Sequence, residues 1–195
     1  MTSLCQDELA AIQRCRRGSR QAFEVLVNRY MKDAYFIALG LVGNRDDALD
    51  LSQEAFVRAY RNIRHIRPGC RFFPWFYQIL KNLCISHLRR ARLRSTRSLD
   101  GDDCPVVPVA ADSCTPDVLA GKNEIREKIW RAIYKLDHKH REVIILRHFR
   151  NMSYEQIAEA IFCNKGTVTS RLYYARKKLK ELLSEEKGGG TGGMR

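Results

Sequence analysis

The stretch from Met152 to Arg176 combines hydroxyl, aromatic and basic side chains at a spacing that suits hydrogen bonding to DNA bases. Ser153 followed by Gln156 forms a capping box, which predicts that a helix begins there. Asn164 can cap a second helix shortly after the first one ends. Two helices joined by so tight a turn cross steeply and leave the second one exposed. The pattern therefore predicts a helix-turn-helix whose second helix reads the major groove of DNA.

The predicted second helix has one apolar side and one polar, basic side. Its apolar stripe consists of Val168, Leu172, Ala175, Leu179 and Leu182. The other side offers groups for base edges near its start and cations for phosphates further along. The candidate DNA contacts are Lys165, Thr167, Thr169, Ser170, Arg171, Tyr173, Tyr174, Arg176 and Lys177. The same pattern also fits a solvated basic face on a helical hairpin. The formal net charge of +13, from 35 Lys plus Arg against 22 Asp plus Glu, favours an anionic polymer as partner.

A second cluster of aromatic and basic residues lies in the first half of the chain. Arginines flank a turn before the aromatic run Phe72–Tyr77, and the same predicted helix ends in the basic run His87–Arg97. Aromatic rings among cations suit single-stranded DNA, because bases stack on rings while cations neutralise phosphates. The aromatic spacing also fits a helix that packs in a core. We expect most of these rings to be core residues, with only Phe72 or Phe73 near nucleic acid.

One helical face is acidic within this basic chain. The predicted helix from Asp46 to Asn62 carries Asp47, Asp50, Gln53 and Glu54 on one side. DNA would be repelled there, so this face suits a protein partner. Compensation of the helix dipole and surface solubility would account for the acids at its start but not for Asp50 and Glu54.

The periodicity of apolar residues indicates an all-α chain. Buried helical stripes are expected at Ala22, Phe23, Leu26 and Tyr30, at Ala48, Leu51, Ala55, Val57 and Tyr60, and at Ile125, Ile129, Ala132, Ile133 and Leu136. Gly43-Asn44 and Arg67-Pro68-Gly69 interrupt the first half. Proline, acids and small residues without helical period predict a flexible linker, and the glycine-rich end predicts a disordered tail. We therefore predict two small helical domains, at residues 1–94 and 120–187, a linker at 95–119 and a tail at 188–195.

Several other classes of protein are disfavoured. No apolar run approaches the roughly 20 residues that span a bilayer, and the N-terminus, with Asp7 and Glu8, does not read as a signal peptide. We expect a cytoplasmic protein without membrane insertion. The seven cysteines include no C-x-x-C pair and are interpreted as reduced, small apolar residues. Cys84 and His87 lack a second pair at zinc spacing, so no metal is predicted. No cofactor motif or catalytic constellation appears, so no catalytic residue is assigned.

Four segments together resemble a known family. They are Ala22–Tyr30, Asp47–Tyr60, Phe73–Asn82 and Gly166–Arg176, and they look like the hallmark segments of extracytoplasmic-function sigma factors, the smallest group of the sigma-70 family. They follow the family's order and spacing, and the likeness covers nearly everything except the linker and the tail. One such segment alone is weak, whereas four in register are highly specific.

The resemblance implies a role for each surface. The chain would be a non-catalytic subunit that brings core RNA polymerase to promoter DNA, with a region-two helical bundle and a region-four helix-turn-helix. The acidic face would bind the clamp helices of the polymerase's largest subunit. The loop Ile66–Phe72, with Asn82 on the next helix, would capture an unstacked base of the minus-ten motif. The assigned minus-ten residues are Ile66, Arg67, Cys70, Arg71, Phe72, Asn82, Arg89 and Arg90. The recognition helix would read the minus-thirty-five motif, and an anti-sigma factor is an expected partner.

Two departures from the family pattern leave the promoter sequence open. Thr169 and Tyr174 stand where relatives often have arginine or lysine, which removes a bidentate guanine contact worth about 1–3 kcal/mol of discrimination. Cys70 and Arg71 replace the small and acidic residues often found in the base-capturing loop. Two alternatives remain. A free-standing helix-turn-helix regulator leaves the acidic and aromatic-basic helices unexplained, and a nuclease or nucleic-acid-modifying enzyme lacks its motifs.

Overall fold

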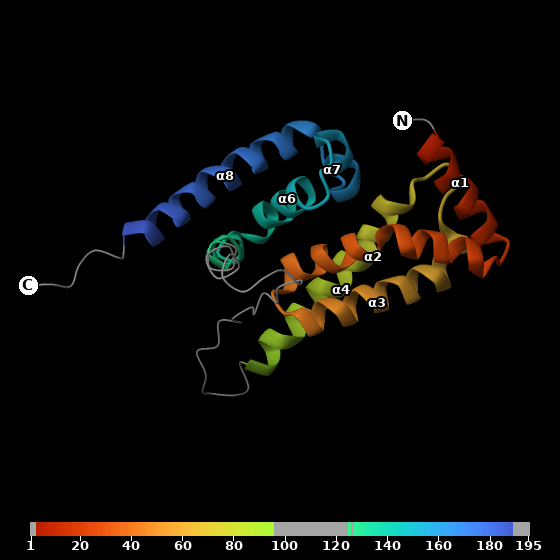
Figure 1. Cartoon of the computed structure of the whole chain (residues 1–195), viewed down its shortest axis with the longest axis horizontal. Coiled ribbons are helices and arrows are strands. Elements are labelled where there is room, and N and C mark those ends of the chain that lie inside the picture. Colours follow the sequence, from red (N-terminus) through yellow and green to blue (C-terminus); the bar gives the residue numbers. More distant parts are fainter. Residues whose placement is uncertain (1–2, 96–124, 126, 189–195) are drawn as a thin grey trace, which may run out of the picture.

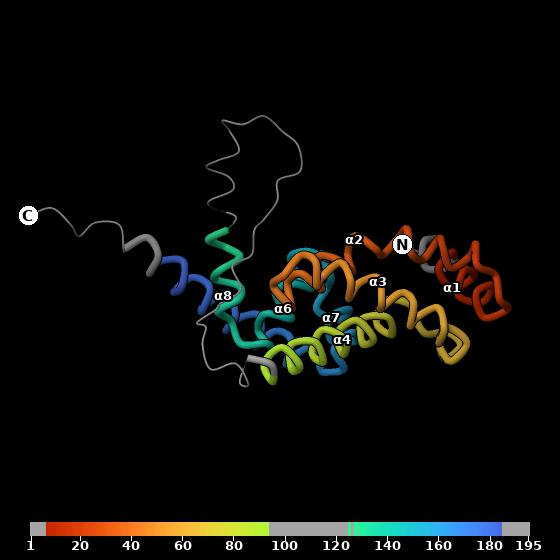
Figure 2. Tube along the Cα trace, turned by 90° about the horizontal axis from the view of Figure 1, so that it is seen from below, coloured from red at the N-terminus to blue at the C-terminus, as the bar shows by residue number. Residues whose placement is uncertain are grey.

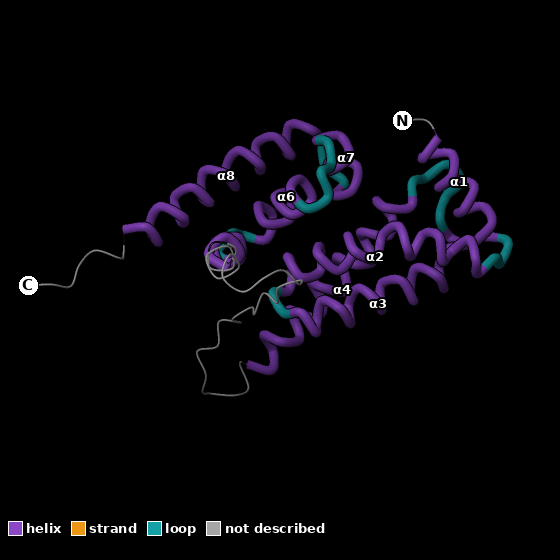
Figure 3. The backbone as a smooth tube through the Cα atoms, viewed as in Figure 1, coloured by secondary structure: helices purple, strands orange, loops and turns teal. Residues whose placement is uncertain are grey.

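The protein is all-helical in the part that its structure, a computed structural model, describes, namely residues 3–95, 125 and 127–188 (Figures 1 and 3). The first half contains α1 (Ser3–Arg16), α2 (Arg20–Val42), α3 (Arg45–Asn62), the short 3-10 helix η1 (Ile63–His65) and α4 (Phe72–Ser95). The second half contains a helical segment over 127–134, then α6 (His138–His148), α7 (Tyr154–Ile161) and α8 (Lys165–Gly188). The all-α prediction is confirmed. Nearly all of the predicted linker and tail lies outside the described residues, and the exact domain boundaries stay a prediction.

The helix starts follow from local capping. Ser19 begins α2 by accepting the backbone N–H of Ala22, and Gly43 ends it in the left-handed region at φ +84°. The side chain of Asn44 accepts the N–H groups of Asp46 and Asp47 at 2.9 and 3.1 Å, as the sequence predicts. Because these bonds satisfy donors that a helix leaves free at its N-terminus, they fix where α3 and its acidic residues begin.

Helices α2, α3 and α4 pack along one another, and α1 crosses them at one end (Figures 1 and 2). The predicted α2 stripe is confirmed, because Ala22, Phe23, Leu26 and Tyr30 are all buried. The aromatic run of α4 fills the same core. Phe56 stacks on Phe76 with ring centroids 4.5 Å apart. These rings stabilise the bundle through area burial and aromatic packing.

Two parts of the predicted core are wrong. On α3, Val57 and Tyr60 are exposed, while Ser52, Phe56 and Ala59 are buried. The helix is rotated relative to the expected stripe because its Phe56 and small residues face α2 and α4. In the second half, Ile125 and Ile129 are exposed, and Trp130 packs in the core with Ile133 and Leu136 instead. In each case the choice between neighbouring stripes depends on the partner helix, which periodicity alone does not specify.

The two halves pack against each other through α2 on α6 and α4 on α7. Gly40 lies so close to α6 that a Cβ there would be 2.5 Å from Cδ1 of Ile145, so a side chain at this position would force Ile145 to shift. The Tyr134 hydroxyl donates to the Leu39 carbonyl at 2.7 Å. The carboxylate of Glu142, 2 % exposed, accepts the Tyr77 hydroxyl at 2.7 Å and pairs with the Lys81 ammonium at 2.6 Å. A buried, paired charge therefore joins α4 to α6.

Candidate polymerase and promoter interfaces

The acidic face of α3 is exposed as predicted, although not all of its members are equally free. Asp50 and Gln53 are exposed on the surface. Glu54 is half-buried and forms an ion pair with Arg58 at 2.7 Å. Asp47 pairs with His87 of α4 at 3.2 Å, so it also ties α3 to α4. The centre of an available acidic surface is therefore Asp50, Gln53 and Glu54.

The predicted minus-ten loop divides into buried and exposed residues. Arg67, Cys70 and Arg71 are exposed, and Gly69 takes φ +82°, which shapes the turn. Ile66 and Phe72 are 2 % and 0 % exposed. From the sequence we expect Phe72 or Phe73 to lie near nucleic acid, and both rings are buried in this structure. The side chain of Ile66 is also buried. Ile66 and Phe72 instead anchor the two ends of the loop.

Glu8 fixes this loop from α1, a role that the sequence does not reveal. Its carboxylate is 9 % exposed and accepts the backbone N–H of Phe72 at 2.8 Å and the hydroxyl of Tyr30. The N–H of Phe72 is one of the unsatisfied donors at the start of α4. Glu8 therefore caps α4 although it lies far away in the sequence. This bond also fixes the end of the loop that precedes α4.

The remaining minus-ten candidates lie along α4. Asn82, Arg89 and Arg90 are exposed. At about 1.5 Å of rise per residue, Asn82 lies about 15 Å along the helix from Phe72. The basic end of α4 borders a cleft of about 1090 Å³, which is also lined by His138 and Arg141 of α6. The structure thus places the loop residues at the start of α4, and Arg89 and Arg90 towards its other end.

The second half forms the predicted helix-turn-helix. Both bonds of the capping box are present, with the Ser153 N–H donating to Gln156 at 2.8 Å and the Gln156 N–H donating to Ser153 at 3.2 Å. Phe162 closes α7 in the left-handed region at φ +53°. Asn164 caps α8 by accepting the Thr167 N–H at 2.7 Å. The apolar stripe of α8 is also confirmed, with Val168, Leu172, Ala175 and Leu182 buried and Leu179 half-buried.

The opposite side of α8 presents the predicted DNA contacts to solvent. Thr167 and Arg171 are half-buried, and the others are exposed: Lys165, Thr169, Ser170, Tyr173, Tyr174, Arg176 and Lys177. The rings of Tyr173 and Tyr174 meet edge to face with centroids 5.3 Å apart. Lys165 pairs with Glu155 of α7 at 2.5 Å. Hydrogen bonding to this ammonium lowers the pKa of Glu155 to about 2, so the pair is charged at any physiological pH.

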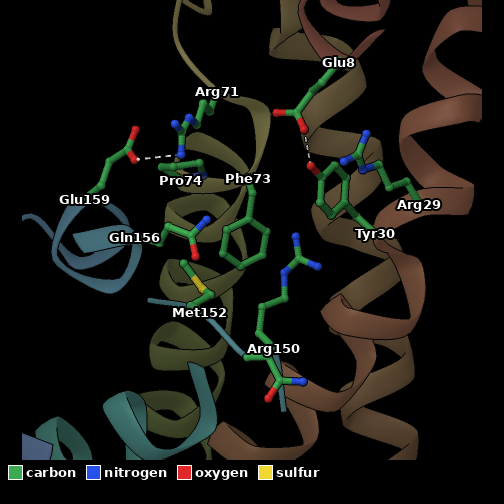
Figure 4. Close-up of a pocket in the computed structure, with 11 residues that line it drawn as sticks. Glu8, Arg29, Tyr30, Arg71, Phe73, Pro74, Arg150, Met152, Gln156 and Glu159 are labelled. Atoms are coloured by element: carbon green, nitrogen blue, oxygen red, sulfur yellow. Dashed lines mark hydrogen bonds and ion pairs between the residues drawn. The ribbon is translucent and has the colours of Figure 1, made fainter. Parts of the chain in front are cut away.

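A pocket of about 390 Å³ lies where the predicted minus-ten loop meets the helix-turn-helix (Figure 4). Arg71 of the loop faces Glu159 of α7, with a nitrogen-to-oxygen distance of 3.7 Å. Arg150 extends over the rings of Phe73 and Tyr30, 4.5 and 4.9 Å from their centroids, and pairs with Asp33. The cations here are balanced by carboxylates from both halves. The predicted minus-ten loop is therefore in direct contact with α7, the first helix of the helix-turn-helix.

Together, a helix-turn-helix with an exposed basic side and an exposed acidic face on α3 are typical of a DNA-binding protein. The sequence matches sigma-70 region 2 over residues 26–94 and sigma-70 region 4 over residues 126–179. The chain belongs to the extracytoplasmic-function group of the sigma-70 family, whose members direct RNA polymerase to promoters for transcription initiation. None of the described helices has an apolar stretch long enough to cross a membrane.

Named relatives share most of the chain. The ECF RNA polymerase sigma-E factor of Haemophilus influenzae is 31% identical over 89% of this chain and 94% of its own length. The sigma-H factor of Pseudomonas aeruginosa is 30% identical over 88% and 91%, and SigW of Bacillus subtilis is 30% identical over 89% and 95%.

Two solved structures have the same fold. RpoE of Bartonella quintana, in complex with the anti-sigma factor NepR, is 28% identical with a TM-score of 0.67 over 83% of this chain and 96% of that one. CnrH in complex with the cytosolic domain of CnrY is 22% identical with a TM-score of 0.68 over 92% and 98%.

Proposed function

We propose that the acidic face of α3 docks on the clamp helices of the largest polymerase subunit. The observation that carries this proposal is an exposed acidic-polar patch, centred on Asp50 and Gln53, on a chain of formal net charge +13. Such a patch repels DNA and complements a basic protein surface. Its place in the region 2 match, which spans residues 26–94, supports the assignment.

The minus-ten element would be bound at the start and along the length of α4. Arg67, Cys70 and Arg71 are the loop side chains free to meet an unstacked base, while Asn82, Arg89 and Arg90 lie further along the strand's path. The loop is anchored on its buried side by Ile66, Phe72 and Glu8. Unstacking a base costs a few kcal/mol, which contacts to its ring, edge and phosphates offset.

The minus-thirty-five element would be read by the exposed side of α8. One side of this helix packs on α6 and α7 and the other side is exposed, and region 4 matches residues 126–179. Near the start of the helix, Lys165, Thr167, Thr169, Ser170 and Tyr173 would face base edges. Further along, Arg176 and Lys177 would face phosphates.

Binding both elements requires the two halves to separate. Elements about 25 base pairs apart lie about 85 Å apart along DNA at about 3.4 Å per base pair. Arg71 and Glu159, on the two DNA-binding units, are 3.7 Å apart. The closed arrangement therefore belongs to the sigma factor before it engages a promoter, and binding to polymerase in the cytoplasm would open it.

An anti-sigma factor is the proposed partner of the closed arrangement. The similar structures of RpoE and CnrH were each solved with such a protein or its cytosolic domain. In this chain the seam between the halves carries both cations and carboxylates, including Arg71, Arg150 and Glu159. A partner that spans the seam would contact both halves and keep them together.

Transcription with sigma-free core polymerase tests these assignments. The purified chain and core should start transcripts at a small number of sites in fragmented host DNA, and those sites should share paired upstream motifs. Asp50→Lys with Glu54→Lys should abolish these transcripts and binding to core. Glu24→Lys with Glu181→Lys, which changes the same charge at exposed sites on α2 and α8, should leave core binding intact. Equal loss in both double variants would show that net charge, and not the α3 face, determines docking.

The same experiment distinguishes a sigma factor from a free-standing helix-turn-helix regulator. Such a protein would bind duplex DNA sequence-specifically without polymerase, and transcripts would not depend on it when core is active with another sigma factor.

A further inference from the structure

The hydroxyl groups at the start of α8 are already used within the protein. The Thr167 hydroxyl donates to the Asn164 side chain at 2.8 Å, and the Thr169 hydroxyl donates to the Lys165 carbonyl at 3.0 Å. The Ser170 hydroxyl donates to the Gly166 carbonyl at 3.0 Å. A hydroxyl group has a single hydrogen to donate. These three side chains therefore keep no hydrogen for an acceptor on a base.

This arrangement disfavours guanine beneath the first turns of α8. In the major groove guanine presents only acceptors, N7 and O6. The cation closest to the helix start, Lys165, is held by Glu155 at 2.5 Å. Threonine occupies position 169, which therefore carries no guanidinium. Guanine would have to be read from elsewhere on the helix.

Thr169 can still offer a base its methyl group and the acceptor lone pairs of its hydroxyl oxygen, and of these only the methyl suits an apolar contact. Its hydroxyl and methyl occupy different staggered positions on Cβ. Because the hydroxyl is bonded back to the Lys165 carbonyl, the methyl takes another position on an exposed side chain.

The surroundings of Thr169 suit a base edge with a methyl group. Thr169 borders a hollow of about 530 Å³ together with Tyr154 and Tyr173, and Arg176, Lys177 and Lys180 line the same hollow. Aromatic walls offer apolar contact, and the three cations can neutralise phosphates beside the contacted base. The thymine C5-methyl is the apolar group that the major groove displays.

We propose that Thr169 determines promoter specificity by packing its methyl group against a thymine C5-methyl in the upstream element. This inference rests on the proposed role of α8 and names the base that this part of the helix reads. It predicts a thymine that the protein recognises by shape and not by a hydrogen bond.

Replacing thymine by deoxyuridine tests the contact, because deoxyuridine lacks only the C5-methyl. Holoenzyme made from core polymerase and the full chain would transcribe duplex promoters from the genomic experiment, with each upstream thymine replaced in turn. One replacement should lower initiation about fourfold, the factor that corresponds to losing the burial of one methyl-sized group. Replacements in the spacer between the elements serve as the control.

Two variants of Thr169 identify the protein side of the contact. Thr169→Ser keeps the hydroxyl and removes the methyl, so the ratio of thymine to deoxyuridine activity at that position should fall to about one. Thr169→Val keeps a methyl and removes the hydroxyl, so it should retain the ratio. Retention of the ratio by Thr169→Ser, or its loss in Thr169→Val, would overturn the proposal. So would an upstream motif without thymine.

The outcomes also distinguish failure of the thymine contact from failure of the proposed promoter role. Transcripts that depend on the chain but ignore deoxyuridine at every upstream position would overturn the thymine contact alone. The absence of any transcript that depends on the chain would remove the proposed promoter role and the thymine contact with it.

Discussion

Glu8 is a single side chain on which three segments of the first half depend. It lies in α1, its acceptors meet Tyr30 of α2, and it accepts the N–H of Phe72 at the start of α4. In the sequence Glu8 is only one of two acids near the N-terminus, and its partner Phe72 lies 64 residues away. Local pattern could not find this contact, because the distance between the two residues is closed only by folding.

Removing the carboxylate of Glu8 should lower the free energy of unfolding. Glu8→Ala leaves a buried N–H and a buried hydroxyl without their acceptor, and each such group costs about 1–3 kcal/mol. We expect the free energy of unfolding of the full chain in urea to fall by about 2–4 kcal/mol. Glu24→Ala, at an exposed position of α2, is the matched control and should change it by less than about 0.5 kcal/mol. Equal effects would mean that Glu8 does not anchor the loop.

The cysteines should differ sharply in reactivity. Burial raises the pKa of the Cys84 thiol to about 12 and also raises the pKa of Cys15. At pH 8 a thiol of pKa about 12 is thiolate in about one part in ten thousand, and the thiolate is the nucleophile. Cys70 is exposed in the predicted minus-ten loop. Iodoacetamide should therefore label Cys70 within minutes in the native protein and leave Cys15 and Cys84 unlabelled until urea is added, as peptide mass spectrometry would show.

Helix boundaries could be predicted from sequence where the determining contacts are local. Asn44, the Ser153–Gln156 pair and Asn164 each cap a helix within three residues, and the structure has all of these contacts. The rotation of a helix about its own axis could not be predicted so well. Val57 and Ile129 fit an apolar period yet are exposed, because neighbouring helices select a different stripe. For the same reason, the burial of Ile66 and Phe72 at the two ends of their loop could not be predicted from the sequence.

The cap of α8 offers a test at this scale. Asn164→Ala removes the acceptor of the Thr167 N–H and hydroxyl, and loss of such a cap costs about 1 kcal/mol. We expect that loss in urea unfolding, together with weaker transcription from promoters that need the upstream element. Asn164→Ser supplies another good cap and should restore most of both. If Asn164→Ser behaves like Asn164→Ala, the asparagine acts at the DNA and not as a cap.

At the scale of the whole molecule, the closed arrangement depends on a charge that is buried between the halves. Glu142 of α6 has its charge matched by Lys81 of α4 and its second contact supplied by Tyr77. Burial is the first cause that raises the pKa of Tyr77, followed by the Glu142 carboxylate, so the tyrosine stays protonated and remains a donor. A carboxylate so placed stabilises closure only while both partners are present, because burying a charge without a partner is costly.

Because an unpaired buried charge is costly, Lys81→Met alone should open the molecule. Substituting Tyr77 and Glu142 as well should close it again. Lys81→Met leaves Glu142 buried with Tyr77 alone, and removing one partner of a buried pair costs about 3–5 kcal/mol. At about 1.4 kcal/mol per factor of ten, the ratio of open to closed molecules should rise more than about a hundredfold. Small-angle scattering should then report a larger radius of gyration, while circular dichroism reports unchanged helix content.

The triple variant Tyr77→Phe, Lys81→Met, Glu142→Leu should be as closed as the unmodified protein, since a buried ion pair replaced by apolar groups of similar volume is often neutral or stabilising. Glu181→Lys, an exposed charge change on α8, should not alter the radius. A triple variant as open as Lys81→Met would show that the polar contacts themselves, and not the penalty of an unpaired charge, hold the halves together. A Lys81→Met protein as compact as the original would place the closing energy in the apolar contact of Gly40 with Ile145 instead.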